Sequence, residues 1–61
     1  MVVYYIENRI KELNSMIKLM EYNLEHCYSK KDYIKLEAKL DMYRYALDEI
    51  LAIYEKIKEY Y

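Results

Sequence analysis

The sequence predicts an all-α protein, an antiparallel two-helix hairpin that dimerises into a four-helix bundle. Apolar residues recur at alternating spacings of three and four along two stretches, a pattern typical of amphipathic helices with coiled-coil-like seams. The chain also contains no Gly and no Pro, so nothing interrupts either stretch. Its 61 residues form at most one small domain, and a chain of this size usually needs a disulfide, a metal or a partner for stability.

The first apolar stripe predicts a helix over about residues 3–27. Its spacing alternates between three and four residues throughout, which places all of its members on one face of a helix. The members are Val3, Ile6, Ile10, Leu13, Ile17, Met20, Leu24 and Cys27. We therefore expect Cys27 to be a small core residue at the end of the hairpin.

The second stripe predicts a helix over about residues 30–60, after a turn at about 28–29. Its members are Tyr33, Leu36, Leu40, Tyr43, Leu47, Ile50, Tyr54, Ile57 and Tyr61. This stripe is rotated by about 200° from a continuation of the first, so the chain is expected to break between them. Ser29 is the expected N-cap of a capping box that ends at Asp32, and Tyr28 is expected to pack against Tyr33. The single hairpin fills the whole chain, residues 1–61.

The register of the hairpin follows from where the chain folds back. A turn this short makes the two helices antiparallel. Folding about position 30 makes every layer apolar, including the pairs Ile6–Tyr54 and Met20–Leu40. Folding half a turn earlier also gives apolar layers, so the pattern leaves both registers open.

Composition excludes several classes of function. The net charge is −1, and one Cys with one His can close neither an intrachain disulfide nor a four-ligand zinc site. No apolar run approaches the length of a membrane span, and no Gly is present to cradle a phosphate. We therefore expect no enzyme, no catalytic or metal-binding residue, no cofactor and no membrane partner. The free Cys and the absence of an export signal favour a cytoplasmic, intracellular location.

Charged side chains three or four residues apart predict ion pairs within each helix, each worth about 0.2–0.5 kcal/mol. The expected pairs are Glu7–Lys11, Asp41–Arg44, Arg44–Asp48 and Glu55–Lys58.

Apolar residues outside the seam predict a surface for self-association or for a partner. Two helices shield only the seam between them, so a lone hairpin leaves these side chains in water. Pairing two hairpins as a homodimer covers them. The candidate surface comprises Met16, Leu19, Tyr22, Ile34, Tyr45, Ala46, Leu51 and Ile53. The predicted function is a small non-enzymatic interaction module, an adaptor, inhibitor or regulator that binds itself and an unidentified protein.

A basic cluster supports an alternative function, the binding of RNA or DNA. Lys30, Lys31, Lys35 and Lys39 could contact phosphates, and several of the ten Tyr residues could stack on bases. In length and plan the predicted dimer resembles the plasmid RNA-binding protein Rop, a hairpin that dimerises into a four-helix bundle, although no motif is shared. The composition would suit a protein encoded by a virus, a plasmid or an AT-rich microbe.

A second alternative depends on residues 37–41. This stretch resembles the Ser-Gln-Glu-Leu-Asp signature of the sporulation aspartyl-phosphate phosphatases at Leu40 and Asp41. Those proteins are small antiparallel helical hairpins. The resemblance implies a phosphatase-like regulator in which Asp41 is the residue carried over.

Overall fold

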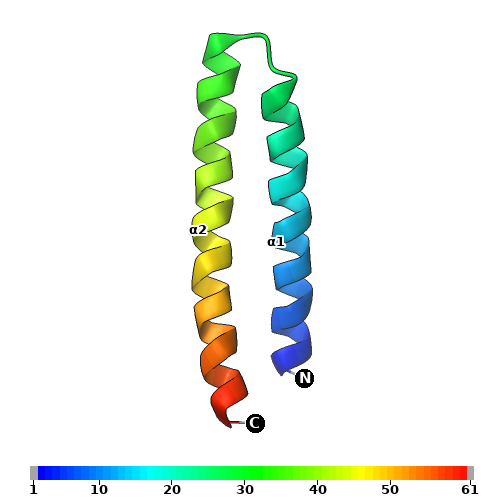
Figure 1. Ribbon diagram of the computed structural model, residues 1–61, viewed down its shortest axis with the longest axis vertical. Coiled ribbons are helices and arrows are strands. Elements are labelled where there is room, and N and C mark those ends of the chain that lie inside the picture. Colours follow the sequence, from blue (N-terminus) through cyan, green and yellow to red (C-terminus); the bar gives the residue numbers. More distant parts are fainter. Residues whose placement is uncertain (1, 61) are drawn as a thin grey trace.

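The computed structural model describes residues 2–60, and these form two helices joined by a short turn. Helix α1 spans Val2–Glu25 and helix α2 spans Lys30–Tyr60. The helices lie side by side and antiparallel, so that the start of α1 and the end of α2 lie at the end of the hairpin opposite the turn (Figure 1). The prediction of an all-helical chain with two helices is confirmed. The hairpin measures 47 × 14 × 12 Å.

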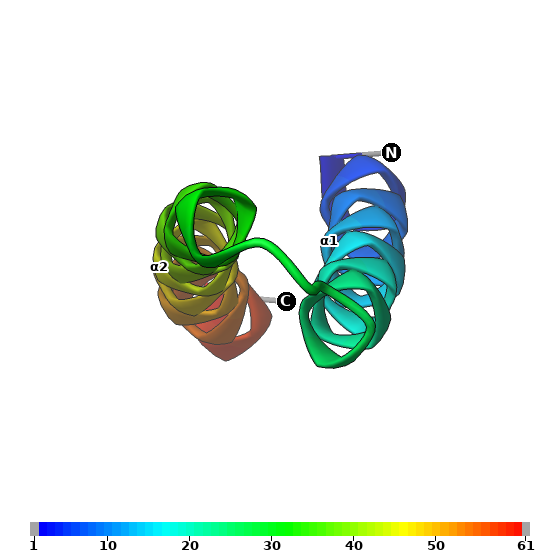
Figure 2. The same cartoon turned by 90° about the horizontal axis from the view of Figure 1, so that it is seen from above.

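The predicted stripes form the contact between α1 and α2. Every member of the first stripe is buried or half-buried, and so are the members of the second stripe from Leu36 to Ile57. Among residues 2–60, only four hydrophobic side chains are buried: Ile6, Leu13, Ile17 and Leu40. Tyr33 departs from the pattern because 41% of it is exposed, and Tyr61 lies outside the described residues. The core is therefore a single narrow seam between the two helices. The helices lie side by side in the view from above (Figure 2).

The start of α2 depends on Ser29. The backbone N–H of Asp32 donates to Ser29 Oγ at 3.4 Å, which is the N-cap contact predicted from the sequence. The N–H of Tyr33 donates to the Ser29 carbonyl at 2.9 Å and begins the helical hydrogen bonding. Ser29 thus satisfies one backbone donor that the first turn would otherwise leave without a partner.

Helix α1 ends at Glu25, before the last member of its stripe. The N–H of Cys27 donates to the Leu24 carbonyl at 3.3 Å, so the final turn tightens before the chain leaves the helix. The expected packing of Tyr28 on Tyr33 is wrong, because Tyr28 is 98% exposed. Tyr28 belongs to the irregular segment between the helices and extends into solvent instead of back onto α2.

Two polar contacts between the helices agree with the register that folds about position 30. Tyr54 donates to Glu7, and Arg44 donates to Glu21. Glu7 follows Ile6, which this register places opposite Tyr54. Both contacts lie on the same side of the seam, and the two sides of the seam carry different side chains.

Candidate interaction surface

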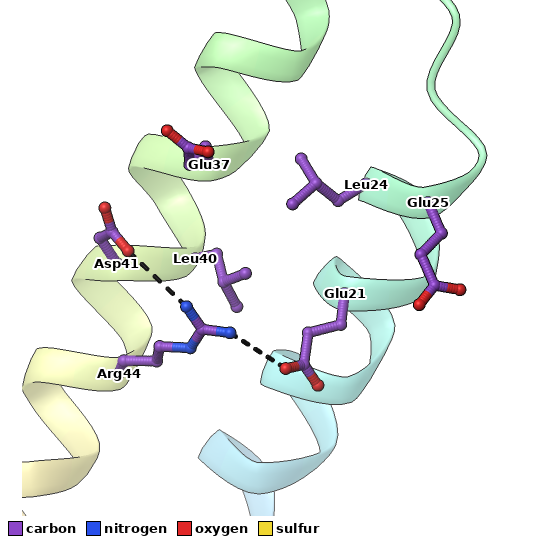
Figure 3. A pocket seen from close by; sticks show the side chains of 7 residues that line it. All are labelled: Glu21, Leu24, Glu25, Glu37, Leu40, Asp41 and Arg44. Carbon is purple, nitrogen blue, oxygen red and sulfur yellow. Dashed lines mark hydrogen bonds and ion pairs between the residues drawn. The ribbon is translucent and has the colours of Figure 1, made fainter.

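One side of the seam, here called the polar flank, carries an ion-pair network. Arg44 of α2 donates to Glu21 Oε2 of α1 at 3.0 Å, and its other nitrogen lies 3.8 Å from Asp41 Oδ1. Figure 3 shows Arg44 reaching from α2 toward Glu21 on α1, with Leu40 beside it and Leu24 projecting from the facing helix. All three charged side chains are about half exposed or more, so each pair contributes at most about 1 kcal/mol.

An open groove of about 460 Å³ runs beside this network. Glu21, Glu25, Glu37 and Asp41 contribute carboxylates to its lining, and Arg44 contributes the single guanidinium. Within residues 2–60, no group of three or more His, Cys, Asp or Glu side chains is arranged to hold a metal ion. The side chain of Asp41, the residue that the phosphatase resemblance singles out, is 70% exposed and paired with Arg44.

The polar flank continues toward the chain ends at Tyr54. Its hydroxyl donates to Glu7 Oε2 at 2.8 Å, and Lys58 Nζ lies 5.1 Å from the centre of its ring. The hydrogen bond to Glu7 is the main cause that raises the pKa of Tyr54 above its usual value near 10, with smaller contributions from desolvation and from the charges of Glu7 and Glu55. The contact joins residues 47 apart in the chain and requires a neutral phenol.

The raised pKa of Tyr54 gives a pH-dependent stability. A folded-state pKa above the unfolded value of about 10 means that the contribution is complete below about pH 10 and is lost as the pH rises through the folded-state pKa. We expect Tyr54→Phe, which keeps the ring beneath Lys58, to lower the Tm at neutral pH. The difference from the native chain is expected to vanish at alkaline pH.

Thermal melts of both chains from neutral to strongly alkaline pH measure this difference. Tyr45→Phe is the control, because Tyr45 is 68% exposed and lies on the outer side of α2. A Tm difference between the native chain and Tyr54→Phe that does not change with pH would show that the phenol proton is not involved.

The opposite side of the seam, the apolar flank, has a different lining. A groove of about 320 Å³ opens there between the helices. Its lining consists of Arg9, Leu13, Lys39, Met42, Tyr43 and Ala46. Arg9 pairs with Glu12 of its own helix at 3.1 Å, and no polar contact across the helices is found on this flank among residues 2–60.

Two rows of side chains border the apolar flank, both at alternating spacings of three and four. The row on α1 includes Arg9, Glu12, Met16 and Leu19; the row on α2 is Lys35, Lys39, Met42, Ala46, Glu49, Ile53 and Lys56. Met42 is 72% exposed, and Leu19 and Ile53 are each about half exposed. These rows are a second, weaker heptad pattern beside the seam.

The eight residues of the predicted surface lie on three sides of the hairpin. Met16, Leu19, Ala46 and Ile53 lie on the apolar flank. Leu51 lines a groove on the polar flank with Glu7 and Tyr54, and the helical spacing places Ile34 on that flank as well. Tyr22 and Tyr45 face outward, 60% and 68% exposed. The structure thus groups four of the eight and adds Met42, which the sequence analysis did not single out although it follows Lys39 by three residues.

The four lysines of the basic cluster do not form one compact patch. Lys31, Lys35 and Lys39 follow one another at intervals of four along one side of α2, whereas Lys30 is rotated by about 100° from Lys31. Lys39 also borders the apolar groove. Tyr28 is the most exposed aromatic residue near them.

His26 directly follows the last residue of α1 and lies beside Tyr22. The two rings stack with centres 4.2 Å apart, and His26 Nδ1 lies 2.9 Å from the Tyr22 carbonyl oxygen, to which the tautomer with its hydrogen on Nδ1 donates. Cys27 Sγ donates to the Ser29 carbonyl at 3.3 Å. These contacts order the turn.

By its fold and its two flanks, the protein is an antiparallel helical hairpin in which an ion-pair network lies on one side of the seam and an apolar groove on the other. Comparisons with family models, curated proteins and solved structures give no match. Neither helix of the described residues is long and apolar enough to cross a membrane.

Proposed function

We propose that this chain is a small interaction module that works through contacts with other protein chains, including copies of itself, and not through catalysis. The observation that carries the proposal is the exposed area. The chain exposes 5320 Å², whereas a compact monomer of 7.6 kDa exposes about 4300 Å². The difference of about 1000 Å² is similar to the roughly 800 Å² that each partner buries in a standard interface.

The chemistry of the exposed side chains supports the same proposal. Leu19, Ile34, Met42 and Ile53 are all at least half exposed. Large apolar surfaces on a small protein are typical of sites that another chain covers. The proposal includes an intracellular location, which the single free thiol of Cys27 favours. An adaptor, an inhibitor and a regulator all fit this description.

Affinity capture from a lysate, after cross-linking with the tagged chain, tests the proposal. The native chain is expected to recover a defined chain, either another copy or a different protein. The double variant Leu19→Lys, Ile53→Lys is expected to lose it. Both positions are half exposed, so the hairpin itself tolerates the change.

The matched control is Ser15→Lys, Ala52→Lys. It adds the same charge, one residue on each helix, at exposed outward positions away from both flanks. If the native chain recovers neither another copy nor a different protein, the proposed function is refuted. Loss of the captured chain in both double variants would assign the effect to charge and not to the apolar side chains.

One observation favours the second candidate, nucleic-acid binding. Tyr28 is 98% exposed in the turn, and Lys30 and Lys31 begin the next helix. An aromatic ring beside lysines can stack on an unpaired base while the lysines contact phosphates. Retardation of single-stranded RNA at low salt, lost in Tyr28→Ser and in Lys31→Ala, would support it. No retardation at low salt would remove it.

A further inference from the structure

The two flanks differ in what a partner would have to cover. On the polar flank, a partner would bury the ion pairs of Arg44 and the contact between Tyr54 and Glu7, which is costly unless every charge finds a new partner. On the apolar flank the central side chains are Met16, Met42 and Ala46. Covering these removes apolar surface from water without breaking a polar contact between the helices.

The two charges nearest this apolar centre have opposite signs, whereas Lys35 and Lys56, farther out at either end of the row, are both basic. Along the α2 row, Lys35 and Lys39 precede Met42 and Ala46, and Glu49 follows them. The spacing along the centre of this row is symmetric about position 44. Met42 and Ala46 each lie two residues from that position, and Lys39 and Glu49 each lie five residues from it. A second α2 laid antiparallel on the first therefore places Met42 against Ala46 and Lys39 against Glu49, twice, by two-fold symmetry.

We propose that a second copy of this chain occupies the apolar flank, with α2 antiparallel to α2 across a two-fold axis, giving a four-helix bundle. The inference rests on the proposed function and names its partner. The interface pairs Lys39 of each copy with Glu49 of the other around the Met42 and Ala46 contacts. Charge complementarity supports a copy of the same chain as the partner, because its own Glu49 and Lys39 stand at the positions that face Lys39 and Glu49.

The alternative two-fold arrangement, with α1 over the second α2, fits less well. In the register of the hairpin, Glu12 and Glu49 lie at the same height along the helices. An axis parallel to the helices would bring these two carboxylates together between the copies, which is repulsive. The arrangement of α2 on α2 avoids this.

The area available agrees with a homodimer. Two separate hairpins expose twice 5320 Å², whereas a compact protein of twice the mass exposes about 7100 Å². A bundle as compact as that would bury about 3500 Å² in total, which lies within the roughly 2000–5000 Å² of obligate homodimers.

Light scattering of the full chain across a wide concentration range tests the arrangement, with helix content measured on each variant. We expect a native dimer, and Met42→Lys to raise the dissociation constant at least about tenfold, since Met42 is 72% exposed in the hairpin and its replacement disturbs only the interface. Ile34→Lys, 59% exposed on the polar flank, is the matched control and is expected to leave the dissociation constant unchanged.

Charge exchange tests the pairing itself. Lys39→Glu and Glu49→Lys are each expected to weaken the dimer, and the double variant that carries both is expected to restore it. A native chain that stays monomeric overturns the proposal, as does a control variant that dissociates as readily as Met42→Lys, or a double variant as weak as the single ones. A monomer that still captures a different protein would leave the proposed function intact, so the two failures are distinguishable.

Discussion

Leu40→Ala is expected to lower the free energy of unfolding by about 2–5 kcal/mol, the range for a fully buried Leu that leaves a cavity. Leu40 is 2% exposed, the lowest fraction among the buried side chains, and it lines the same groove as Leu24 and Arg44. A core of this size supplies only about 3–5 kcal/mol in total. The substitution therefore removes most of the stability of a single hairpin, and loss of helix signal in a urea or thermal titration measures it.

Ile34→Ala is the matched control for Leu40→Ala. It shortens an aliphatic side chain on the same helix, but Ile34 is 59% exposed. Its effect is expected to stay within about 0.5 kcal/mol, as for most surface substitutions. Equal losses in the two variants would show that the seam around Leu40 is not the core of the protein.

Ala38→Pro is expected to cost about 3 kcal/mol or more, because proline removes a backbone N–H from the helix interior and its ring clashes with the preceding turn. Ala38 lies in the third turn of α2, within the helix interior. Because Ala38 is exposed, its side chain contributes little packing. Loss of helix content and of cooperative melting, followed by circular dichroism, is the expected result.

The control is a second proline, Lys30→Pro. Lys30 is the first residue of α2, where the N–H has no partner within the helix and the fixed φ of proline is favourable. Ser29 before it is the N-cap, whose extended backbone suits the position preceding a proline. We expect a change within about 0.5 kcal/mol. A large loss in Lys30→Pro would mean that helix continues through the turn.

The seam could be predicted from the sequence because its signal is periodic and strong. Burial follows spacing along α1 from Val3 to Leu24, and the core depends on this spacing more than on any single residue. Ser29 could be predicted for a similar reason, since its hydroxyl and the first turn of α2 are close in the chain. Local patterns of this kind need no knowledge of the tertiary contacts.

The contacts across the helices could not be predicted in the same way. The sequence pairs Arg44 with Asp41, as observed, but it also suggests Asp48, and the shorter contact is with Glu21 on the other helix. Likewise Glu7 accepts from Tyr54, whereas Lys11 was its expected partner. A long charged side chain has several possible partners within reach. Which pair forms depends on the register of the two helices and on the side-chain rotamers.

The sequence predicts that apolar residues lie outside the seam, but it does not show on which side of the seam each of them lies. The sequence identifies most of the exposed apolar residues but not Met42, and the difference between the flanks appears only when each residue is assigned to a side of the seam. The heptad row from Lys35 to Lys56 contains that information. The pattern of this row is weaker than that of the seam because four of its seven residues are charged.

The shortness of the turn also determines the order in which the hairpin closes and opens. Only four residues separate Glu25 from Lys30, and closing so small a loop costs little chain entropy. The layers next to the turn can therefore form early, and each one shortens the loop that the next must close. The contact between Glu7 and Tyr54 spans 47 residues and is expected to close among the last. We therefore expect the contacts between α1 and α2 to form from the turn at Ser29 toward the opposite end of the hairpin. On unfolding, the contacts at that opposite end are expected to be lost first.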